Sequence, residues 1–110
     1  MFAHKVSIHL KPGRLAEFTK ILEQEIVPLL RKQPGFEDEI AFAVPGESDV
    51  LAISLWGSKQ NADVYDKGAY KDILRMLEPV VEGIPKIATP EVLHSTFHEI
   101  HEIAVGVPIA

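Results

Sequence analysis

Residues 50–56 read VLAISLW, and this run decides the fold because it carries no charge on either face. A strand without charge is typical of the middle of a sheet that is covered on both sides. A second strand-like run begins at Phe36, and the sequence PGESD at residues 45–49 is a turn signal between the two runs. Residues 36–56 are therefore predicted to form a hairpin within a sheet.

The segment before the hairpin is predicted to contain a strand and a helix. Residues 4–10 alternate in the manner of a strand with one apolar face. Apolar residues at helical spacing predict a helix over residues 15–30. Pro28 removes one backbone donor from this helix and should kink it about a turn earlier, near Gln24. The residues on the apolar face of the strand are His4, Val6, Ile8 and Leu10.

The segment after the hairpin is predicted to contain a broken helix and a last strand. Ser58 is a suitable N-cap for the helix. Gly68 should interrupt it, and a second helical stretch begins at Ala69. The last strand is expected from about Lys86 to Ile100, where side chains alternate again.

The resulting order is strand, helix, strand, strand, helix, strand. Two split β-α-β units of this kind predict an α+β fold, the ferredoxin-like βαββαβ arrangement with a four-stranded antiparallel sheet and both helices on one face. A chain of 110 residues has the size of one domain, so residues 1–110 are interpreted as a single domain. The apolar tail at residues 104–110 is expected to pack on the body or on a partner chain.

The side of the sheet away from the helices needs a partner. If Leu51, Ile53 and Leu55 face the helices, the alternate residues of the same strand form an apolar patch on the other side. Burial of apolar surface is worth about 25 cal/mol per Å2, so covering such a patch gains several kcal/mol. The sequence therefore predicts an isologous homodimer in which two sheet faces meet.

Composition excludes several classes of function. The formal net charge is −5 and no run of Lys or Arg occurs, which argues against nucleic acid as a partner. The chain has no cysteine, which removes disulfides, thiol nucleophiles and thiolate metal sites. No signal peptide is visible and no apolar segment is long enough to span a membrane. A soluble cytoplasmic protein is the expectation.

Three segments carry a resemblance to a known family. They are VPLLRKQPGF at residues 27–36, WGS at residues 56–58 and LEPVVEGIP at residues 77–85. Together they resemble the antibiotic-biosynthesis monooxygenase family of dimeric α+β barrels, and the likeness runs from about Val6 to Phe97.

The resemblance implies a homodimer with a pocket in each chain between the sheet and the helices. Some relatives oxygenate quinols or aromatic polyketides with molecular oxygen and without metal or flavin, others degrade haem, and many have no known reaction. The haem-degrading branch pairs an Asn of the first strand with a Trp and a His of the second helix. This chain has no Asn in its first strand and neither Trp nor His between Ala69 and Val81, so haem degradation is not expected.

A cofactor-independent oxygenase needs a pocket for a flat substrate and a base that forms an electron-rich anion. The candidate substrate-binding residues are Trp56, Tyr65, Tyr70 and Phe42. The alternative interpretation places Trp56 and Phe42 in the core and the two tyrosines at its rim.

The histidines are the candidates for the base, and His9 and His94 are chosen for that role. A metal site is not expected, because His94 and His98 would lie roughly 13 Å apart on a regular strand. The carboxylates at residues 37–39 open a strand and are interpreted as solvated charge. No phosphate-binding loop or nucleophile elbow is present.

The leading hypothesis is a cofactor-independent monooxygenase that acts on a quinol-like or polycyclic aromatic small molecule. The alternative is a non-catalytic dimer of the same fold that binds a small apolar ligand or serves as an accessory subunit. A different reaction on the same barrel, such as isomerisation of an unsaturated lactone, stays open because a fold does not determine a reaction.

Overall fold

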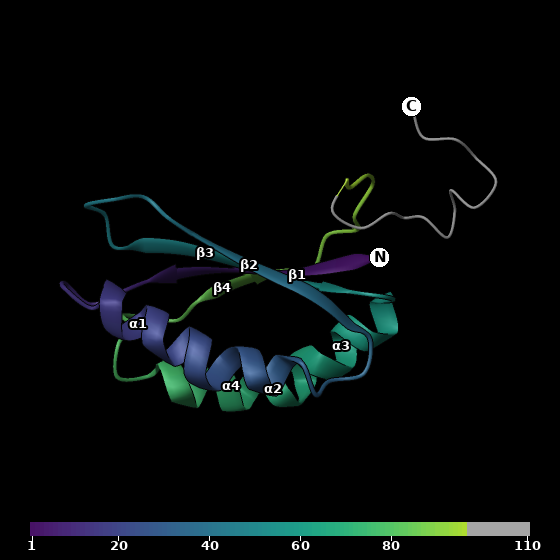
Figure 1. Ribbon diagram of the computed structural model, residues 1–110, viewed down its shortest axis with the longest axis horizontal. Coiled ribbons are helices and arrows are strands. Elements are labelled where there is room, and N and C mark those ends of the chain that lie inside the picture. The colour runs from purple at the N-terminus through teal and green to yellow at the C-terminus, as the bar shows by residue number, and fades with distance from the viewer. Residues whose placement is uncertain (97–110) are drawn as a thin grey trace.

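The computed structural model describes residues 1–96, which form a four-stranded sheet with helices on one face (Figure 1). The apolar tail at residues 104–110 lies outside the described residues. The elements are β1 (Phe2–His9), α1 (Leu15–Ile21), the π-helix η1 (Leu22–Ile26), α2 (Val27–Leu30), β2 (Phe36–Ala43), β3 (Asp49–Trp56), α3 (Lys59–Lys67), α4 (Ala69–Leu77) and β4 (Lys86–Ala88).

The strands follow the order β2-β3-β1-β4 and all neighbours are antiparallel. β3 lies between β1 and β2, as its uncharged sequence predicted. The α1-η1-α2 segment and the α3-α4 segment cover the same face of the sheet (Figure 1). The predicted α+β ferredoxin-like fold is confirmed.

The face of β3 that meets the helices is the opposite of the one supposed from the sequence. Val50 and Trp56 are buried in the core, with 4% and 0% of their surfaces exposed. They stand opposite Ile8 and Phe2 of β1, whose apolar face also meets the helices. Leu51, Ile53 and Leu55 therefore lie on the outer face, because side chains alternate along a strand.

A β-bulge near the start of β2 determines which of its residues face the helices. Phe36 pairs with Trp56, but Asp38 pairs with Leu55, so β2 has one extra residue at this point. An extra residue reverses the alternation of side chains that follows it. As a result Phe36 packs edge-on against Trp56 on the helix side, and Glu39 also points to that side.

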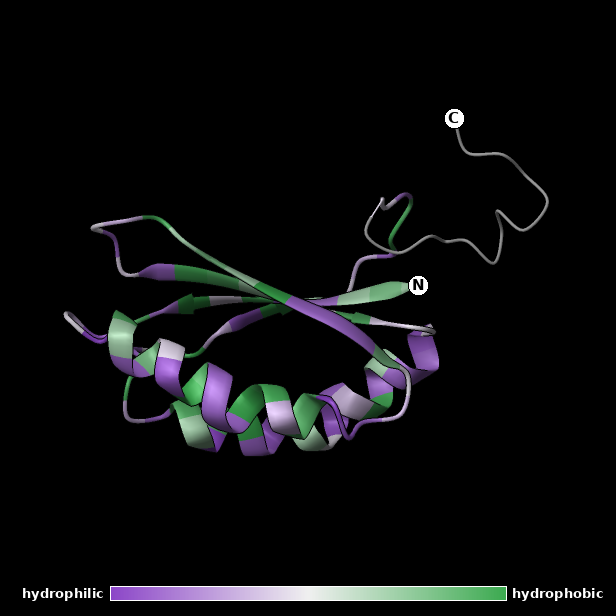
Figure 2. Ribbon diagram, in the orientation of Figure 1, coloured by the Kyte–Doolittle hydropathy of each residue, from purple (hydrophilic) through white to green (hydrophobic). Residues whose placement is uncertain are grey.

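The first long helix is interrupted where the sequence placed a kink. The N–H of Val27 donates to the carbonyl of Leu22, five residues back, and η1 surrounds the predicted position at Gln24. Pro28 has no N–H for the carbonyl of Gln24, so the regular ladder cannot continue through this turn. Figure 2 shows hydrophobic and hydrophilic residues alternating along these helices, as amphipathic helices require.

Two predicted boundaries of the second helical segment are confirmed. The Oγ of Ser58 accepts a hydrogen bond from the N–H of Asn61 at 3.1 Å and caps α3. Gly68 separates α3 from α4. Upstream, Gly35 has a φ of 80°, and a Cβ at this position would collide with the side chain of Asn61. The turn into β2 therefore needs glycine on two counts.

The last strand is much shorter than predicted. β4 ends at Ala88, and a single bridge between Glu91 and Phe2 continues the pairing. Residues 92–96 have no strand structure, and residues 97–100 lie outside the described residues. Pro90 has no N–H to donate to a ladder, which explains the early end of the strand. Within residues 1–96, no helix is long and apolar enough to cross a membrane.

Candidate functional site

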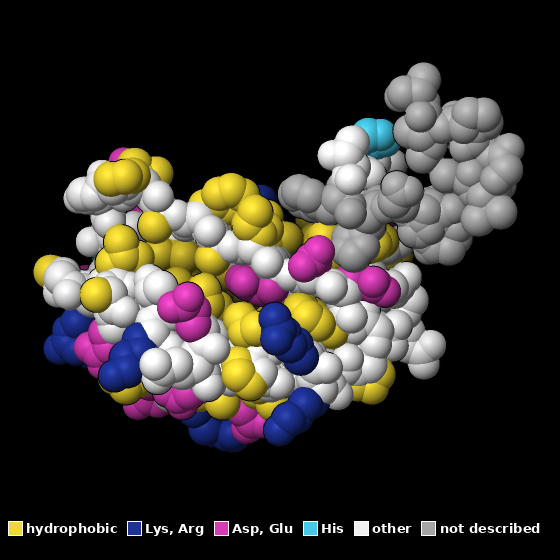
Figure 3. Space-filling view, viewed as in Figure 1, with side chains coloured by type: hydrophobic (Ala, Val, Ile, Leu, Met, Phe, Trp, Pro, Cys, Tyr) yellow, Lys and Arg dark blue, Asp and Glu magenta, His cyan; other side chains and the backbone are white. Residues whose placement is uncertain are grey.

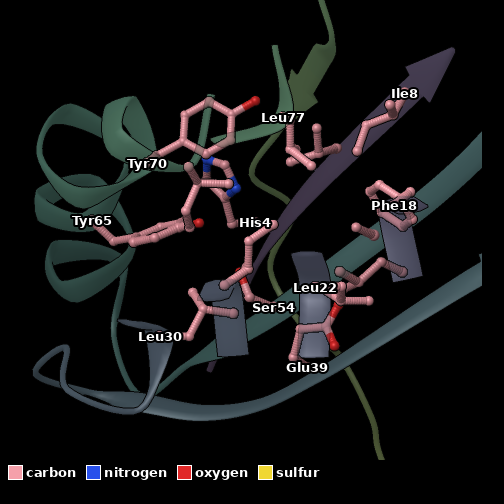
Figure 4. A pocket seen from close by; sticks show the side chains of 15 residues that line it. His4, Ile8, Phe18, Leu22, Leu30, Glu39, Ser54, Tyr65, Tyr70 and Leu77 are labelled. Atoms are coloured by element: carbon pink, nitrogen blue, oxygen red, sulfur yellow. The ribbon is translucent and has the colours of Figure 1, made fainter. Parts of the chain in front are cut away.

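A cavity lies between the helix face of the sheet and the helices (Figure 4). It contains about 400 Å3 of empty space when its open mouth is included, of which about 40 Å3 can hold water-sized molecules. A water needs roughly 10–15 Å3 of such space, so the cavity has room for a few waters. An aromatic ligand must therefore displace side chains at the mouth to enter.

The α1-η1-α2 segment forms one apolar wall of the cavity. Phe18, Leu22, Ile26 and Leu30 all line it, at intervals of four residues. In a regular α-helix a residue four positions ahead is rotated by about 40°, so such a row would drift away from the cavity. The π-helical turn η1 winds less per residue and offsets this drift. The interruption of the helix therefore keeps the wall aligned.

The polar side of the cavity contains His4, whose side chain is 1% exposed. Its Nε2 lies 2.7 Å from Oδ1 of Asp66 on α3. An ionised carboxylate only accepts hydrogen bonds, so Nε2 carries the proton in this pair. In the neutral imidazole the lone pair is then on Nδ1, which is buried and has no partner within residues 1–96. This lone pair is the group that could accept a proton from a ligand.

Aromatic rings surround His4. The edge of the imidazole approaches Tyr65 with ring centroids 5.0 Å apart and Tyr70 with ring centroids 4.8 Å apart. Tyr65 in turn stacks on Trp56 at 4.5 Å. Burial raises the pKa of Tyr65 and raises the pKa of Tyr70 to about 12, so both are neutral phenols near pH 7. Figure 4 shows His4 between the two tyrosines.

Glu39 of β2 lines the cavity on the side opposite His4 (Figure 4). Burial, and to a smaller extent the nearby charge of Asp38, raises the pKa of Glu39 to about 7. The Oε2 atom of Glu39 is buried and has no partner among the described residues. The expectation that residues 37–39 are solvated charge is therefore wrong for Glu39, because the bulge directs this side chain inward.

Three buried side-chain atoms lack a hydrogen-bond partner within residues 1–96, and all three belong to residues that line this cavity. They are Nδ1 of His4, Oε2 of Glu39 and Oη of Tyr70. Buried polar groups are normally paired, so such a cluster indicates a place for waters or for a polar ligand. The cavity therefore offers three hydrogen-bonding atoms to waters or to a polar ligand.

The structure brings only part of the predicted site into this cavity. Tyr65 and Tyr70 line it, and Trp56 lies behind Tyr65 in the core. Phe42 is on the outer face of β2, with 51% of its surface exposed, because it follows the bulge. The prediction that Phe42 lines the pocket between sheet and helices is therefore wrong.

Neither histidine chosen as the base lies in the cavity. His9 is on the outer face of β1, where its Nδ1 lies 2.8 Å from Oδ1 of Asp49. That hydrogen bond raises the pKa of His9. His94 is exposed and follows the last strand. Within residues 1–96, no group of three metal-ligating side chains comes together.

Sequence reasoning passed over His4, Asp66 and Glu39. A signal for His4 was present, since it shares one alternating face with apolar residues of β1 and such a face points to the core. Asp66 carries no comparable signal, because its partner is 62 residues away in the sequence. Glu39 could not be assigned to a face without knowledge of the bulge.

Comparison with known proteins supports the fold. No protein-family model and no curated protein sequence matches the chain. Among solved structures, a monooxygenase of Streptomyces coelicolor in complex with the ligand nanaomycin D is 19% identical, with a TM-score of 0.70 over 86% of this chain and 88% of that one. SnoaB, a cofactor-independent oxygenase from Streptomyces nogalater, is 11% identical, with a TM-score of 0.70 over 86% of this chain and 95% of that one.

A third similar structure has a different chemistry. The haem degrader MhuD from Mycobacterium tuberculosis, with two haems bound in its active site, is 18% identical, with a TM-score of 0.71 over 87% of this chain and 99% of that one. Identities this low establish a shared fold and leave the reaction open. The chain therefore shares the ferredoxin-like α+β fold of these three structures, with a four-stranded antiparallel sheet and its helices on one face.

Proposed function

We propose that this protein is a cofactor-independent monooxygenase in which His4 removes a proton from a phenolic or quinol-like aromatic substrate. The observation that carries the proposal is the buried Nδ1 of His4, which has no partner within residues 1–96 and belongs to a side chain that lines the cavity. A histidine is suited to proton transfer near neutral pH. The similarity to SnoaB and to the nanaomycin D complex supports the choice of reaction class.

The chemistry needs no external reductant. Loss of a proton to His4 leaves an aromatic anion, and an electron-rich anion can react with molecular oxygen directly. For a substrate of the anthrone type, a CH2 group and O2 become a C=O group and water, so the atoms and electrons balance. The apolar walls exclude bulk water from the anion, while Asp66 holds the imidazole in position through its hydrogen bond at 2.7 Å.

An oxygen electrode tests this proposal with a panel that runs from monocyclic hydroquinones through naphthols to anthrones. The natural chain should consume oxygen above the background rate with at least one compound. His4→Gln should lower that rate by about 100-fold or more, because a base contributes about this much. The Gln amide can still donate to Asp66, so the fold is retained.

His9→Gln is the matched control, because His9 lies on the same strand but on the outer face. It should keep the natural rate. Background rates with every compound, or an active His4→Gln protein, would overturn the proposal.

A second candidate is a non-catalytic protein that binds a small ligand. The small space of about 40 Å3 that water-sized molecules can occupy favours it, since this space suits a smaller molecule than a polycyclic substrate. A panel compound that raises the melting temperature without oxygen consumption would support this second candidate over the first.

We further propose that the chain forms a homodimer through the outer face of the sheet. Ile40, Phe42 and Val44 are exposed there, with 36%, 51% and 54% of their surfaces open, and Leu51 and Ile53 lie on the neighbouring strand. Figure 3 shows hydrophobic side chains gathered above the region where β2 and β3 lie. An exposed apolar face of this kind is typical of a protein interface.

A further inference from the structure

The polar residues that the sheet contributes to the cavity form one row across three neighbouring strands. His4 of β1 stands opposite Ser54 of β3, and Glu39 of β2 stands opposite the same Ser54 from the other side. All three residues line the cavity. The next row toward the hairpin contains only the apolar residues Val6, Ala52 and Ala41. On the helix face of the sheet, His4 and Glu39 thus stand at the two ends of a polar row, and the row beside it is apolar.

The middle residue of the row is already paired. The Oγ of Ser54 accepts a hydrogen bond from Nε1 of Trp56 at 2.9 Å. The residues at the two ends of the row differ from Ser54. Nδ1 of His4 and Oε2 of Glu39 are both buried and have no partner within residues 1–96. Adjacent strands are about 4.8 Å apart, so the backbones of His4 and Glu39 are separated by roughly 10 Å. Side chains that lean inward from both ends can flank a single aromatic ring.

The two ends are suited to different tasks. With its Nε2 proton committed to Asp66, a neutral His4 can only accept a hydrogen bond at Nδ1. Glu39 has a pKa of about 7, so below that pH it carries a proton and can donate one. The other titratable groups that line the cavity are Tyr65 and Tyr70, and Asp38 is the charged neighbour on the same strand.

We propose that Glu39 donates a hydrogen bond to an oxygen of the substrate that lies across the ring from the group deprotonated by His4. The preferred substrates are then aromatic molecules with an acidic hydroxyl or CH2 group at one end and an oxygen at the opposite end. When His4 takes the proton, the electron pair left behind spreads through the ring to that oxygen. A carboxyl group placed there stabilises the charge as it develops.

This inference deepens the proposed function and rests on the same cavity, but its test does not require turnover. The test compares the binding of 4-methoxyphenol and 4-ethylphenol by isothermal titration calorimetry under nitrogen. The two ligands have similar shapes and present the same hydroxyl to His4. Only 4-methoxyphenol has an acceptor oxygen opposite that hydroxyl. The ratio of the two dissociation constants therefore isolates the group that meets the oxygen.

The natural protein should bind 4-methoxyphenol about two- to tenfold more tightly than 4-ethylphenol at about pH 6, as one added hydrogen bond predicts. This preference should disappear at about pH 8.5, because Glu39 has then lost its proton while phenols, with pKa values near 10, have not. The hydroxyl that meets His4 is the same in both ligands, so its contribution cancels in the ratio.

Variants separate the donor from the shape of the site. Glu39→Leu should prefer 4-ethylphenol at both pH values, since no donor is left. Glu39→Gln should keep the preference for 4-methoxyphenol at both pH values, because its amide donates regardless of pH. Glu25→Gln, on the exposed side of η1, is the control and should behave as the natural protein.

A preference for 4-methoxyphenol that survives in Glu39→Leu would overturn the proposal, and so would the absence of binding by both ligands at millimolar concentration. Waters alone in the cavity would produce that second result. The oxygenase proposal fails separately, through background oxygen consumption by the natural protein. A protein that shows the Glu39-dependent preference without oxygen consumption would retain the binding role of Glu39 and lose the reaction.

Discussion

The Nε2 atom of His4 and the Oδ1 atom of Asp66 are 2.7 Å apart, which connects the first strand to α3 across 62 residues of sequence. The pair is asymmetric, because the imidazole is 1% exposed and the carboxylate is 35% exposed. The carboxylate of Asp66 thus lies near water while the imidazole of His4 lies inside. Asp66 is a positioning residue, and its removal should affect both folding and proton transfer.

Asp66→Ala should lower the free energy of unfolding by about 1–2 kcal/mol, because a buried imidazole N–H loses its acceptor. Asp63→Ala on the same helix should lower the free energy of unfolding much less, since Asp63 forms an exposed ion pair with Lys59. Urea unfolding measures both values. Equal losses in the two variants would contradict the structural role of Asp66.

The stability of the protein should depend on pH through Glu39. Its pKa is raised from 4.5 to about 7 on folding, so the folded state binds more protons than the unfolded state between these values. The contribution of this group to stability therefore falls as pH rises through that window and is absent from Glu39→Gln. Glu39→Gln should be more stable than the natural chain at about pH 8, by about 1 kcal/mol. This figure is smaller than the full pKa shift implies, because Glu39 is partly exposed and water at the cavity mouth screens its charge.

Chemical unfolding at about pH 5 and about pH 8 checks this, and the two proteins should nearly coincide at the lower pH, where Glu39 is mostly protonated in the folded state. A stability difference that is the same at both pH values would contradict an ionising, partly buried Glu39.

Tyr70→Phe should stabilise the ligand-free protein or leave it unchanged. The Oη of Tyr70 is buried and has no partner within residues 1–96, so its removal ends a desolvation cost of up to about 1 kcal/mol. Thermal unfolding measures the change, and the affinity for 4-methoxyphenol should fall in the same variant if the hydroxyl contacts ligand. A clear loss of stability would show that Tyr70 has a partner in the folded protein.

The proposed dimer can be tested on the outer face of the sheet. Phe42→Lys should convert a dimer to a monomer in light scattering, because a charge in an apolar interface is costly. Val64→Lys is the control, since Val64 is an equally apolar exposed residue, 60% open, on α3. A natural chain that is monomeric at micromolar concentration would contradict the dimer itself.

The order of elements could be predicted from the sequence because it depends on periodicity and on local signals. The uncharged run at residues 50–56, the N-cap at Ser58 and the break at Gly68 each act within a few residues. The length of the last strand could not be predicted from alternation alone. Side chains continue to alternate after Lys86, but Pro90 has no N–H and interrupts the backbone hydrogen bonds that a longer strand needs.

The site could be predicted only in part, because one β-bulge determines which side chains of β2 face the helices. The bulge between Phe36 and Asp38 directs Glu39 toward the helices and Phe42 toward the outer face of the sheet. No residue type at this position indicates a bulge in the sequence. Tyr65 and Tyr70 were chosen because aromatic side chains suit a pocket for a flat substrate, and both line the cavity. His4 follows from the alternation of β1, but its partner Asp66 is determined by tertiary structure alone.

The π-helical turn η1 has a consequence for how this protein can change. Phe18 and Leu30 are twelve positions apart, and a regular α-helix of that length would turn Leu30 about 120° away from Phe18. With one residue deleted between Leu22 and Ile26, a regular α-helix would bring Leu30 to within about 20° of Phe18, so the wall would survive the loss of the π-helical turn. The extra residue of η1 therefore marks a position where this chain can shorten by one residue while both ends of the helix keep their contacts with the sheet.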